Sequence, residues 1–288
     1  MKIIFGSAQL MSEYGINKDN KNLIKSELIK IFKLLKKKKT FLIDTAQSYG
    51  NAEKTIGNLI NSKFKIITKV SSLKNYDINN LDKTIFKKIN RSLKNLRIKK
   101  LYGILIHDQN DLKGKKGKKI ISVLKKIKKE GLTKKIGFSC YDTKILLNNL
   151  KKNNFDIVQF PMNVFDQRLL DKKTSNLIKK KKIEVHIRSI FLQGLLTLKK
   201  KKMSFLGSKI KKKLILWNKF LKKNRISSLE ACIAFIKKNI KNYNVVIGIN
   251  NIEQLKQIYN CISSKKGHNL NFNRLNVKNE KIINPSRW

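Results

Sequence analysis

The chain has 288 residues, of which 41% are hydrophobic, so it is long enough to bury the core of one large domain. Its apolar positions are periodic and no apolar run reaches the roughly 20 residues that a spanning helix needs, which argues against disorder and against membrane insertion. Lys and Arg number 67 against 18 Asp and Glu, and the resulting formal charge of +49 should attract anionic ligands, a dinucleotide as well as RNA.

Short runs of β-type residues alternate with helical patterns along the chain. Eight runs are predicted to be strands, at residues 2–7, 40–43, 65–69, 101–106, 135–139, 156–160, 184–189 and 244–247. Between them, apolar residues recur every three or four positions, and the four clearest stripes are Ile24, Leu28, Ile31, Leu35; Leu81, Ile85, Ile89, Leu93; Ile120, Leu124, Ile127; and Ile252, Leu255, Tyr259, Ile262. This alternation predicts an α/β fold, a single-domain (β/α)8 TIM barrel over residues 1–288.

Three local signals refine this prediction. Asp142 follows the fifth predicted strand and precedes an apolar helical stretch, so we expect it to cap that helix. Residues 198–208 are rich in lysine and are predicted to form a long loop after the seventh strand. From about residue 268 the sequence shows little periodicity, and we expect a tail there.

Four residues suited to proton transfer lie at or just past successive predicted strands. Asp44 and Tyr49 follow the second strand, Lys69 ends the third and His107 follows the fourth. The carboxyl ends of barrel strands share one rim, and barrel enzymes place their catalytic groups there. We therefore expect a carboxylate, a phenol, an ammonium and an imidazole to meet in one proton-donating site.

Several segments resemble the aldo-keto reductases. Residues 44–53, DTAQSYGNAE, resemble the family signature around its active-site aspartate and tyrosine. Further similar segments follow in order: ITK at 67–69, LIHD at 105–108, IGFS at 136–139, VQFPMN at 158–163, QGLL at 193–196 and VIG at 246–248. GSAQL at 6–10, YGI at 14–16 and NPSRW at 284–288 are similar to bacterial members. The resemblance covers essentially the whole chain.

The resemblance implies NAD(P)-dependent reduction of a carbonyl without a metal. Tyr49 would be the general acid, and since a free tyrosine titrates near 10, it needs a nearby cation to lower its pKa. Lys69 would supply that cation and Asp44 would pair with Lys69 and hold it in position. His107 would donate to the carbonyl oxygen and orient a small-molecule substrate.

The resemblance also implies a set of residues around NADP or NAD. Ser139 and Gln159 would hydrogen-bond the nicotinamide carboxamide. The loop over the pyrophosphate would contain Ser189, Leu192, Gln193 and Gly194. The adenosine end would lie near a helix N-terminus suited to phosphate, beside Gly248, Asn250, Asn251 and Gln254.

Three positions depart from the family pattern. Cys140 stands where many members have an asparagine for the carboxamide. Arg188 replaces the aromatic residue that stacks on the nicotinamide, although a guanidinium can also stack. Gln254 replaces the arginine that NADPH-preferring members often carry, so the choice between NADH and NADPH stays open.

Each catalytic candidate also has an ordinary structural interpretation. Asp44 could cap a helix that begins near Asn51, and Tyr49 could be an amphipathic rim residue. Lys69 is one lysine among many, and His107 could be a structural histidine with its hydrogen bonds satisfied. Their joint position at successive strand ends favours catalysis.

Other functional classes have weaker support. Three cysteines without C-x-x-C spacing and only three histidines favour free thiols in the cytoplasm and no metal centre. The lysine runs could bind nucleic acid through a non-catalytic barrel, but a composition bias towards Lys, Asn and Ile explains them as well. Gly114 and Gly117 form the GxxG of an RNA-binding KH module, without a separate small domain around it. An auxiliary subunit with an intact site is a third alternative, and neither the substrate nor the oligomeric state follows from the sequence.

Overall fold

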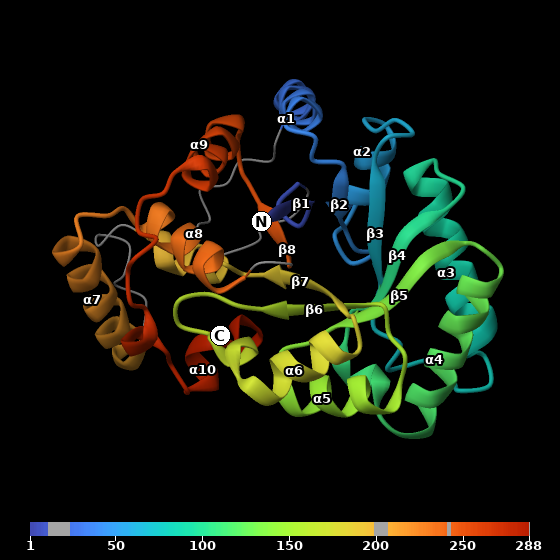
Figure 1. Cartoon of the computed structure of the whole chain (residues 1–288). Coiled ribbons are helices and arrows are strands. Elements are labelled where there is room, and N and C mark those ends of the chain that lie inside the picture. Colours follow the sequence, from blue (N-terminus) through green and yellow to red (C-terminus); the bar gives the residue numbers. More distant parts are fainter. Residues whose placement is uncertain (11–23, 199–206, 241–242, 288) are drawn as a thin grey trace.

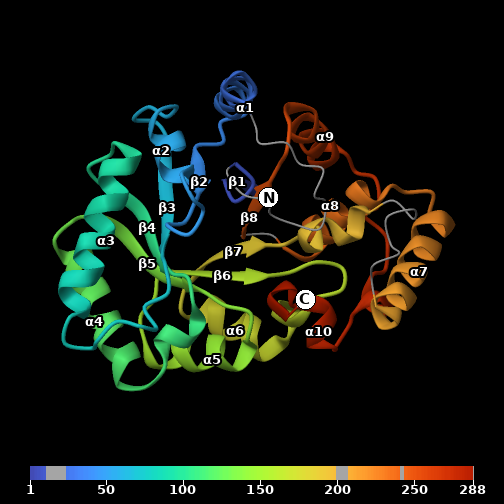
Figure 2. The ribbon, with the colours of Figure 1, turned by 180° about the vertical axis from the view of Figure 1, so that it is seen from behind.

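The computed structural model describes residues 1–10, 24–198, 207–240 and 243–287. Eight parallel strands close a barrel in sequence order (Figures 1 and 2). They are β1 (Lys2–Gly6), β2 (Leu42–Asp44), β3 (Lys65–Val70), β4 (Leu101–Ile106), β5 (Thr133–Ser139), β6 (Ile157–Pro161), β7 (Glu184–Arg188) and β8 (Asn244–Gly248). The predicted single-domain (β/α)8 barrel is confirmed, and no strand bound differs from its prediction by more than two residues.

The strands are apolar on both faces because both faces are covered. A cluster of Ile4, Ile67, Leu105 and Ile157, all fully buried, joins β1, β3, β4 and β6 inside the barrel. The larger apolar core lies between the strands and the surrounding helices. Side chains that are buried on both sides of a parallel sheet give near-continuous apolar runs, which is why the strands could be recognised in the sequence.

Helices surround the barrel in both views of the ribbon. They are α1 (Lys25–Lys37), α2 (Ala52–Gly57), α3 (Leu81–Leu96), α4 (Gly114–Lys129), α5 (Thr143–Lys152), α6 (Lys172–Lys180), α7 (Ser208–Lys223), α8 (Ser228–Asn239), α9 (Ile252–Ser263) and α10 (Glu280–Ile283). The four apolar stripes coincide with α1, α3, α4 and α9, although Ile24 is exposed just before α1. Asp142 caps α5 as expected, accepting from the amides of Lys144 and Ile145. Two helices that were not predicted, α7 and α8, lie between β7 and β8.

A polar network closes the barrel at the amino ends of the strands. The carboxylate of Glu184 accepts hydrogen bonds from Tyr102 Oη (2.8 Å), Asn244 Nδ2 (2.8 Å) and His186 Nε2 (2.7 Å), and it pairs with Lys135. Burial raises the pKa of Glu184, but the hydrogen bonds from His186 and Lys135 outweigh it and bring the pKa to about 2. Barrel enzymes place their catalytic groups at the opposite rim, formed by the carboxyl ends of the strands.

The segment after residue 268 packs on the barrel through short helical turns. These are Asn273–Leu275, α10 and Pro285–Arg287. The amide of Val277 donates to Phe165 O at 2.9 Å, and Gln167 Nε2 donates to Phe272 O at 3.0 Å. The tail thus covers the connection that follows β6. Of the predicted loop at 198–208, residues 199–206 lie outside the described chain, as do residues 14–16 and Trp288 of the similar segments.

The structure bears on two possibilities considered from the sequence, an RNA-binding GxxG motif and a membrane-spanning helix. Gly114 and Gly117 belong to the first turn of α4, and a Cβ on Gly117 would come within 2.3 Å of the Leu112 carbonyl group. That glycine is explained by close packing inside the barrel fold. Within the described residues, no helix is both long enough and apolar enough to cross a bilayer.

Candidate active site

A buried ion pair connects the carboxyl ends of β2 and β3. Lys69 Nζ donates to Asp44 Oδ2 at 2.5 Å and to Thr45 O at 2.9 Å. Gln159 Nε2, from β6, donates to the other oxygen of Asp44 at 2.8 Å. Asp44, Lys69 and Gln159 are all at least 97% buried. A charged pair at this depth is held by its mutual attraction and by these additional hydrogen bonds.

The loop that carries Tyr49 is fixed by residues for which the sequence suggested no role. Gln47 Oε1 accepts from the amide of Ser71 at 3.1 Å, and Gln47 Nε2 donates to Ser92 Oγ at 3.0 Å. Buried Glu53 accepts from Thr68 Oγ1 at 2.7 Å. These contacts tie the loop and α2 to β3 and α3. The only available signal was that both residues lie in the segment 44–53, which resembles the family signature.

The side chains of Tyr49 and His107 lie next to the buried Asp44–Lys69 pair. Lys69 Nζ lies 5.1 Å from the centroid of the Tyr49 ring. The rings of Tyr49 and His107 meet edge to face, with centroids 5.8 Å apart. The structure therefore brings together the four residues that the strand ends were expected to bring together.

The electrostatic state of Tyr49 differs from the expectation. Burial raises the pKa of Tyr49 above its ordinary value, the Asp44 carboxylate adds to the rise, and Arg188 opposes it. The expectation of a lowered pKa is therefore not met, because burial and the Asp44 carboxylate outweigh the opposing charge of Arg188; the effect of Lys69 on Tyr49 stays a prediction. Tyr49 is therefore a neutral phenol across the physiological pH range.

His107 is also neutral. Burial lowers its pKa to about 4, and the charges of Lys69 and Arg188 act in the same direction. Its Nδ1 lies 3.1 Å from Ser48 Oγ. When the Ser48 hydroxyl donates to Nδ1, the ring proton is on Nε2, and that nitrogen can donate to a ligand.

An elongated cavity of about 640 Å³ runs from Asp44 and Tyr49 to the first turns of α9. Eight residues of the predicted cofactor site line it: Gln159, Arg188, Ser189, Gln193, Gly194, Gly248, Asn250 and Gln254. Ser139, Cys140, Leu192 and Asn251 do not; the first three are buried and Asn251 is exposed. Lining residues that the sequence did not single out include Ile190, Phe191, Thr197, Ser228, Leu229 and Gln257.

The loop after β7 reaches the cavity through an unusual backbone. Ser189, Leu192 and Gln193 have φ values of 57°, 49° and 53°, and Gly194 has 92°. L-residues rarely adopt this left-handed region, so the surrounding structure must hold it. Asn163 Nδ2 donates to Ser189 O at 3.1 Å, and the fully buried Leu192 anchors the middle of the loop.

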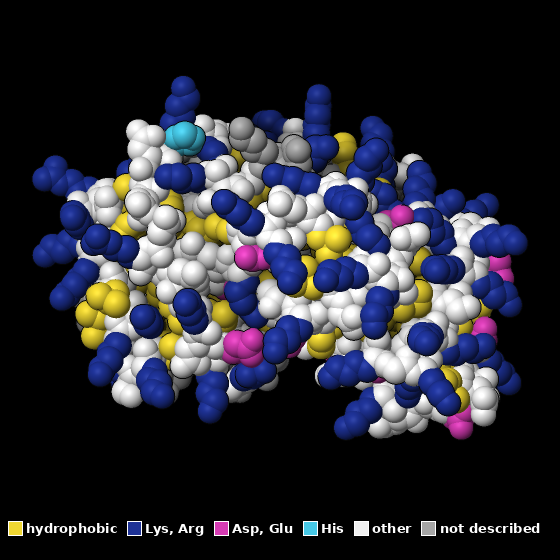
Figure 3. All heavy atoms as spheres, turned by 60° about the horizontal axis from the view of Figure 1, so that its bottom comes forward, with side chains coloured by type: hydrophobic (Ala, Val, Ile, Leu, Met, Phe, Trp, Pro, Cys, Tyr) yellow, Lys and Arg dark blue, Asp and Glu magenta, His cyan; other side chains and the backbone are white. Residues whose placement is uncertain are grey.

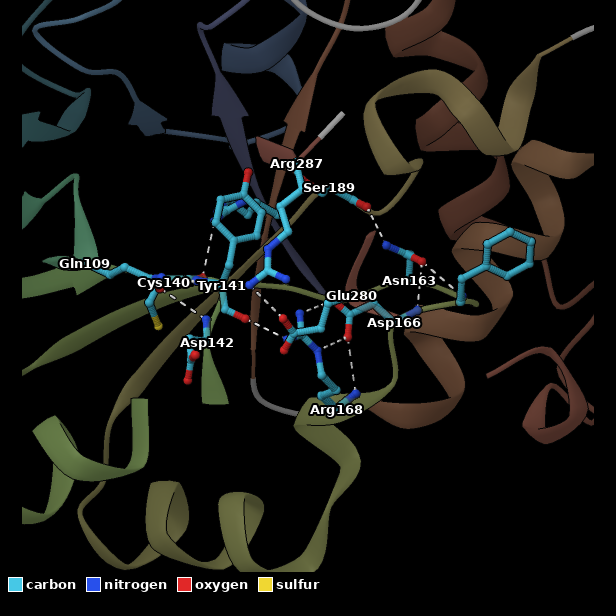
Figure 4. A network of polar contacts seen from close by, with 12 residues as sticks. Gln109, Cys140, Tyr141, Asp142, Asn163, Asp166, Arg168, Ser189, Glu280 and Arg287 are labelled. Atoms are coloured by element: carbon cyan, nitrogen blue, oxygen red, sulfur yellow. Dashed lines mark hydrogen bonds and ion pairs between the residues drawn. The ribbon is translucent and has the colours of Figure 1, made fainter. Parts of the chain in front are cut away.

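Arg188 stacks within the protein. Its guanidinium carbon lies 3.8 Å from the centroid of the Tyr141 ring, and its Nη2 donates to Cys140 O at 3.2 Å. Tyr141 is held in turn by Gln109, whose Oε1 accepts from its amide at 2.8 Å, and by Arg168, which donates to its carbonyl oxygen at 2.7 Å (Figure 4). The sequence did not single out Tyr141, which supplies the aromatic face that Arg188 contacts.

The Arg168 side chain links Tyr141, which contacts Arg188 of the cavity, to the segment after residue 268. It binds both oxygens of the fully buried Asp166 at 2.8 Å and lies 3.8 Å from Glu280 of α10, which pairs with Arg287 (Figure 4). The tail therefore braces Tyr141 through Arg168, which explains why a segment with little periodicity is ordered.

The far end of the cavity is formed by β8 and α9. Gln254 Oε1 accepts from the amide of Asn250 at 2.9 Å, and Asn251 Oδ1 accepts from the amide of Gln254 at 2.8 Å. These side chains cap the helix. Within the described residues, Gln9 Oε1 and Asn250 Oδ1 are buried without a hydrogen-bond partner, and both residues line the cavity.

Comparisons with known proteins agree with this architecture. The model of the aldo/keto reductase family matches residues 2–270. No curated protein sequence matches the chain. Solved structures of similar fold include an aldo-keto reductase from Bacillus halodurans in its holo form (TM-score 0.75, 17% identity, 98% of this chain and 95% of that chain covered). They also include a glycerol dehydrogenase from Gluconobacter oxydans (TM-score 0.66, 17% identity, 91% and 86% covered) and a thermostable aldo-keto reductase bound to the inhibitor epalrestat (TM-score 0.68, 18% identity, 95% and 94% covered).

Identities this low show the shared fold alone. The family model provides the stronger finding, because it extends from the first strand to the residues after α9. Together with the closed parallel barrel, this match confirms the resemblance that the sequence motifs indicated. The chain belongs to the aldo/keto reductase family.

Proposed function

We propose that the protein reduces an aldehyde or ketone to an alcohol with NADH or NADPH, and that Tyr49 is the general acid. The observation that carries the proposal is the buried Asp44–Lys69 pair beneath the Tyr49 and His107 rings, at one end of an elongated cavity. The family and the fold imply this reaction class.

The cavity fits a dinucleotide. Its volume of about 640 Å³ lies within the range of small-molecule and cofactor sites, which are mostly about 300–1,000 Å³. Gln9 Oε1 and Asn250 Oδ1 are buried acceptors in the described part of its wall that can receive hydrogen bonds from a ribose or an amide. The cofactor, when bound, supplies the hydride; the left-handed loop from Ser189 to Gly194 would hold its middle and Gln159 its nicotinamide end.

The protein groups supply the proton and the orientation. As negative charge develops on the carbonyl oxygen, the neutral Tyr49 phenol donates its proton to that oxygen, and neutral His107 donates a second hydrogen bond from Nε2. Asp44 fixes Lys69 beside the Tyr49 ring, so that the ammonium stabilises the phenolate left behind. A phenol with a raised pKa is protonated near neutral pH, which is the state that a proton donor needs.

The excess positive charge does not identify a nucleic-acid site. In Figure 3, Lys and Arg side chains are spread over the whole visible face instead of gathering in one stripe. A specific groove for a phosphate backbone would concentrate them along one track. The distribution on this face therefore gives no support to a non-catalytic nucleic-acid-binding role.

The proposal is tested by titrating the purified protein with NADH and NADPH while its tryptophan fluorescence is recorded. Saturable quenching by at least one cofactor is expected. A panel of aldehydes and ketones is then screened by the loss of nicotinamide absorbance. Tight RNA binding that weakens steeply with salt, without any cofactor binding, would contradict the proposal.

A further inference from the structure

The two ends of the cavity differ in charge. Since the proposed reaction requires the nicotinamide beside Tyr49, the adenosine half would extend to the other end, where Asn250, Gln254 and Gln257 line the wall. Among the described lining residues the one cation is Arg188, and it lies at the Tyr49 end, where it shifts the pKa values of Tyr49 and His107. The α9 end therefore lacks a lining cation in the described structure, although the chain contains 67 Lys and Arg.

The amino terminus of α9 is already bound by an acid from another helix. Glu27 of α1 accepts a hydrogen bond from the amide of Ile252, the first residue of α9, with its Oε1 at 2.7 Å. The Glu27 side chain is 20% exposed, and its other carboxylate oxygen lies 4.0 Å from Nζ of Lys30, which is 67% exposed, so this cation offsets only part of its charge. A helix amino terminus with open amides binds phosphate well, and here a carboxylate takes that position.

Two neighbouring amides are satisfied as well. Gln254 Oε1 receives the amide of Asn250, and Asn251 Oδ1 receives the amide of Gln254. A phosphate at this turn would have to displace protein acceptors, and it would also approach the negative charge of Glu27. The adenosine ends of the two cofactors differ only by the 2′-phosphate of NADPH, so this arrangement opposes one cofactor and tolerates the other.

We propose that Glu27, by holding the amino terminus of α9, makes the protein bind NADH in preference to NADPH. The inference rests on the proposed function, because it assumes a nicotinamide dinucleotide in this cavity. Glu27 is a specificity-determining residue in this account. It lies 225 positions before Ile252 in the sequence, so no motif around the eighth strand could have revealed it.

The test measures the affinities of the full chain for NADH, NADPH, ADP and 2′,5′-ADP by isothermal titration calorimetry. A helix-terminus charge contributes up to about 2 kcal/mol in partly buried geometry, so we expect NADH and ADP to bind about tenfold or more tightly than their 2′-phosphorylated counterparts. In Glu27→Gln the amide oxygen can still accept from Ile252, but the charge is gone. That variant should bind NADPH and 2′,5′-ADP about tenfold more tightly than the wild type, with NADH and ADP changed less than about threefold.

Glu130→Gln is the matched control. Glu130 is exposed at the end of α4, away from α9 in both ribbon views, and its loss changes the net charge equally. It should reproduce the wild-type affinities. Equal or tighter binding of 2′,5′-ADP than of ADP by the wild type would overturn the inference, and so would a shift that is the same in both variants. Absence of binding by either dinucleotide would instead overturn the proposed function.

Discussion

The Asp44–Lys69 ion pair can be tested by substituting either of its two residues. Its side chains are 4% and 1% exposed and its atoms are 2.5 Å apart. Removing one partner of such a buried pair leaves an uncompensated charge and typically costs about 3–5 kcal/mol. A domain is stabilised by only about 5–15 kcal/mol, so Asp44→Asn or Lys69→Met should each consume a large part of the folding free energy. The double variant buries no charge at this position, and we expect it to be more stable than the sum of the single effects implies.

Urea unfolding of the wild type, the two single variants and the double variant measures the energetic coupling between Asp44 and Lys69. We expect an interaction free energy of about 2 kcal/mol or more from the double-mutant cycle. The exposed ion pair between Lys119 and Asp82, whose side chains are 41% and 39% exposed, serves as the control. A cycle on that pair should give about 0–1 kcal/mol. Single variants within about 1 kcal/mol of the wild type, or additive effects, would refute the claim that the pair is buried and mutually dependent.

Three further predictions concern separate parts of the structure. Because burial holds the pKa of His107 at about 4, kcat/KM should stay level as the pH falls through 6.5; an inflection near 6.5 that disappears in His107→Gln would contradict this. Glu184 has its pKa lowered from 4.5 to about 2, so its stabilisation is complete above pH 4.5 and is lost as the pH falls through 2; because solvent screens this partly exposed carboxylate, Glu184→Gln should lose roughly 1–2 kcal/mol of unfolding free energy at pH 7, with the difference shrinking below pH 4.5. A Cβ on Gly248 would lie 1.6 Å from Gln9 Oε1, so Gly248→Ala should displace that acceptor and weaken cofactor binding about fivefold, the value of one hydrogen bond, whereas Gly207→Ala, which has open space around it, should not.

The barrel could be predicted because its signals are local. Strands buried on both faces appear as apolar runs, and helices such as α1 and α4 show apolar stripes against a background of lysine. The helices α7 and α8 were not recognised. α8 is nearly uniformly buried from Ala231 to Ile236, so it lacks the alternation of apolar and polar faces on which recognition depends.

The candidate site could be predicted as a set of residues, but its charge states could not. Strand order placed Asp44, Lys69 and His107 at one rim, and the structure brings them together with Tyr49. The pKa of Tyr49 is raised chiefly by its burial, which depends on the packing of the whole site and has no local sequence signal. The contact of Glu27 with α9 depends on helix packing across the closure of the barrel, and no local sequence pattern carries that information.

The central claim is that Tyr49 donates the proton and has no part in holding the cofactor. The most direct measurement compares Tyr49→Phe with the wild type in two assays, cofactor binding by fluorescence titration and turnover of a carbonyl substrate identified with the wild type. The account predicts cofactor affinity within about threefold of the wild type and a loss of turnover of at least about 100-fold, the lower bound for a positioned acid. A variant that keeps the wild-type kcat would contradict it.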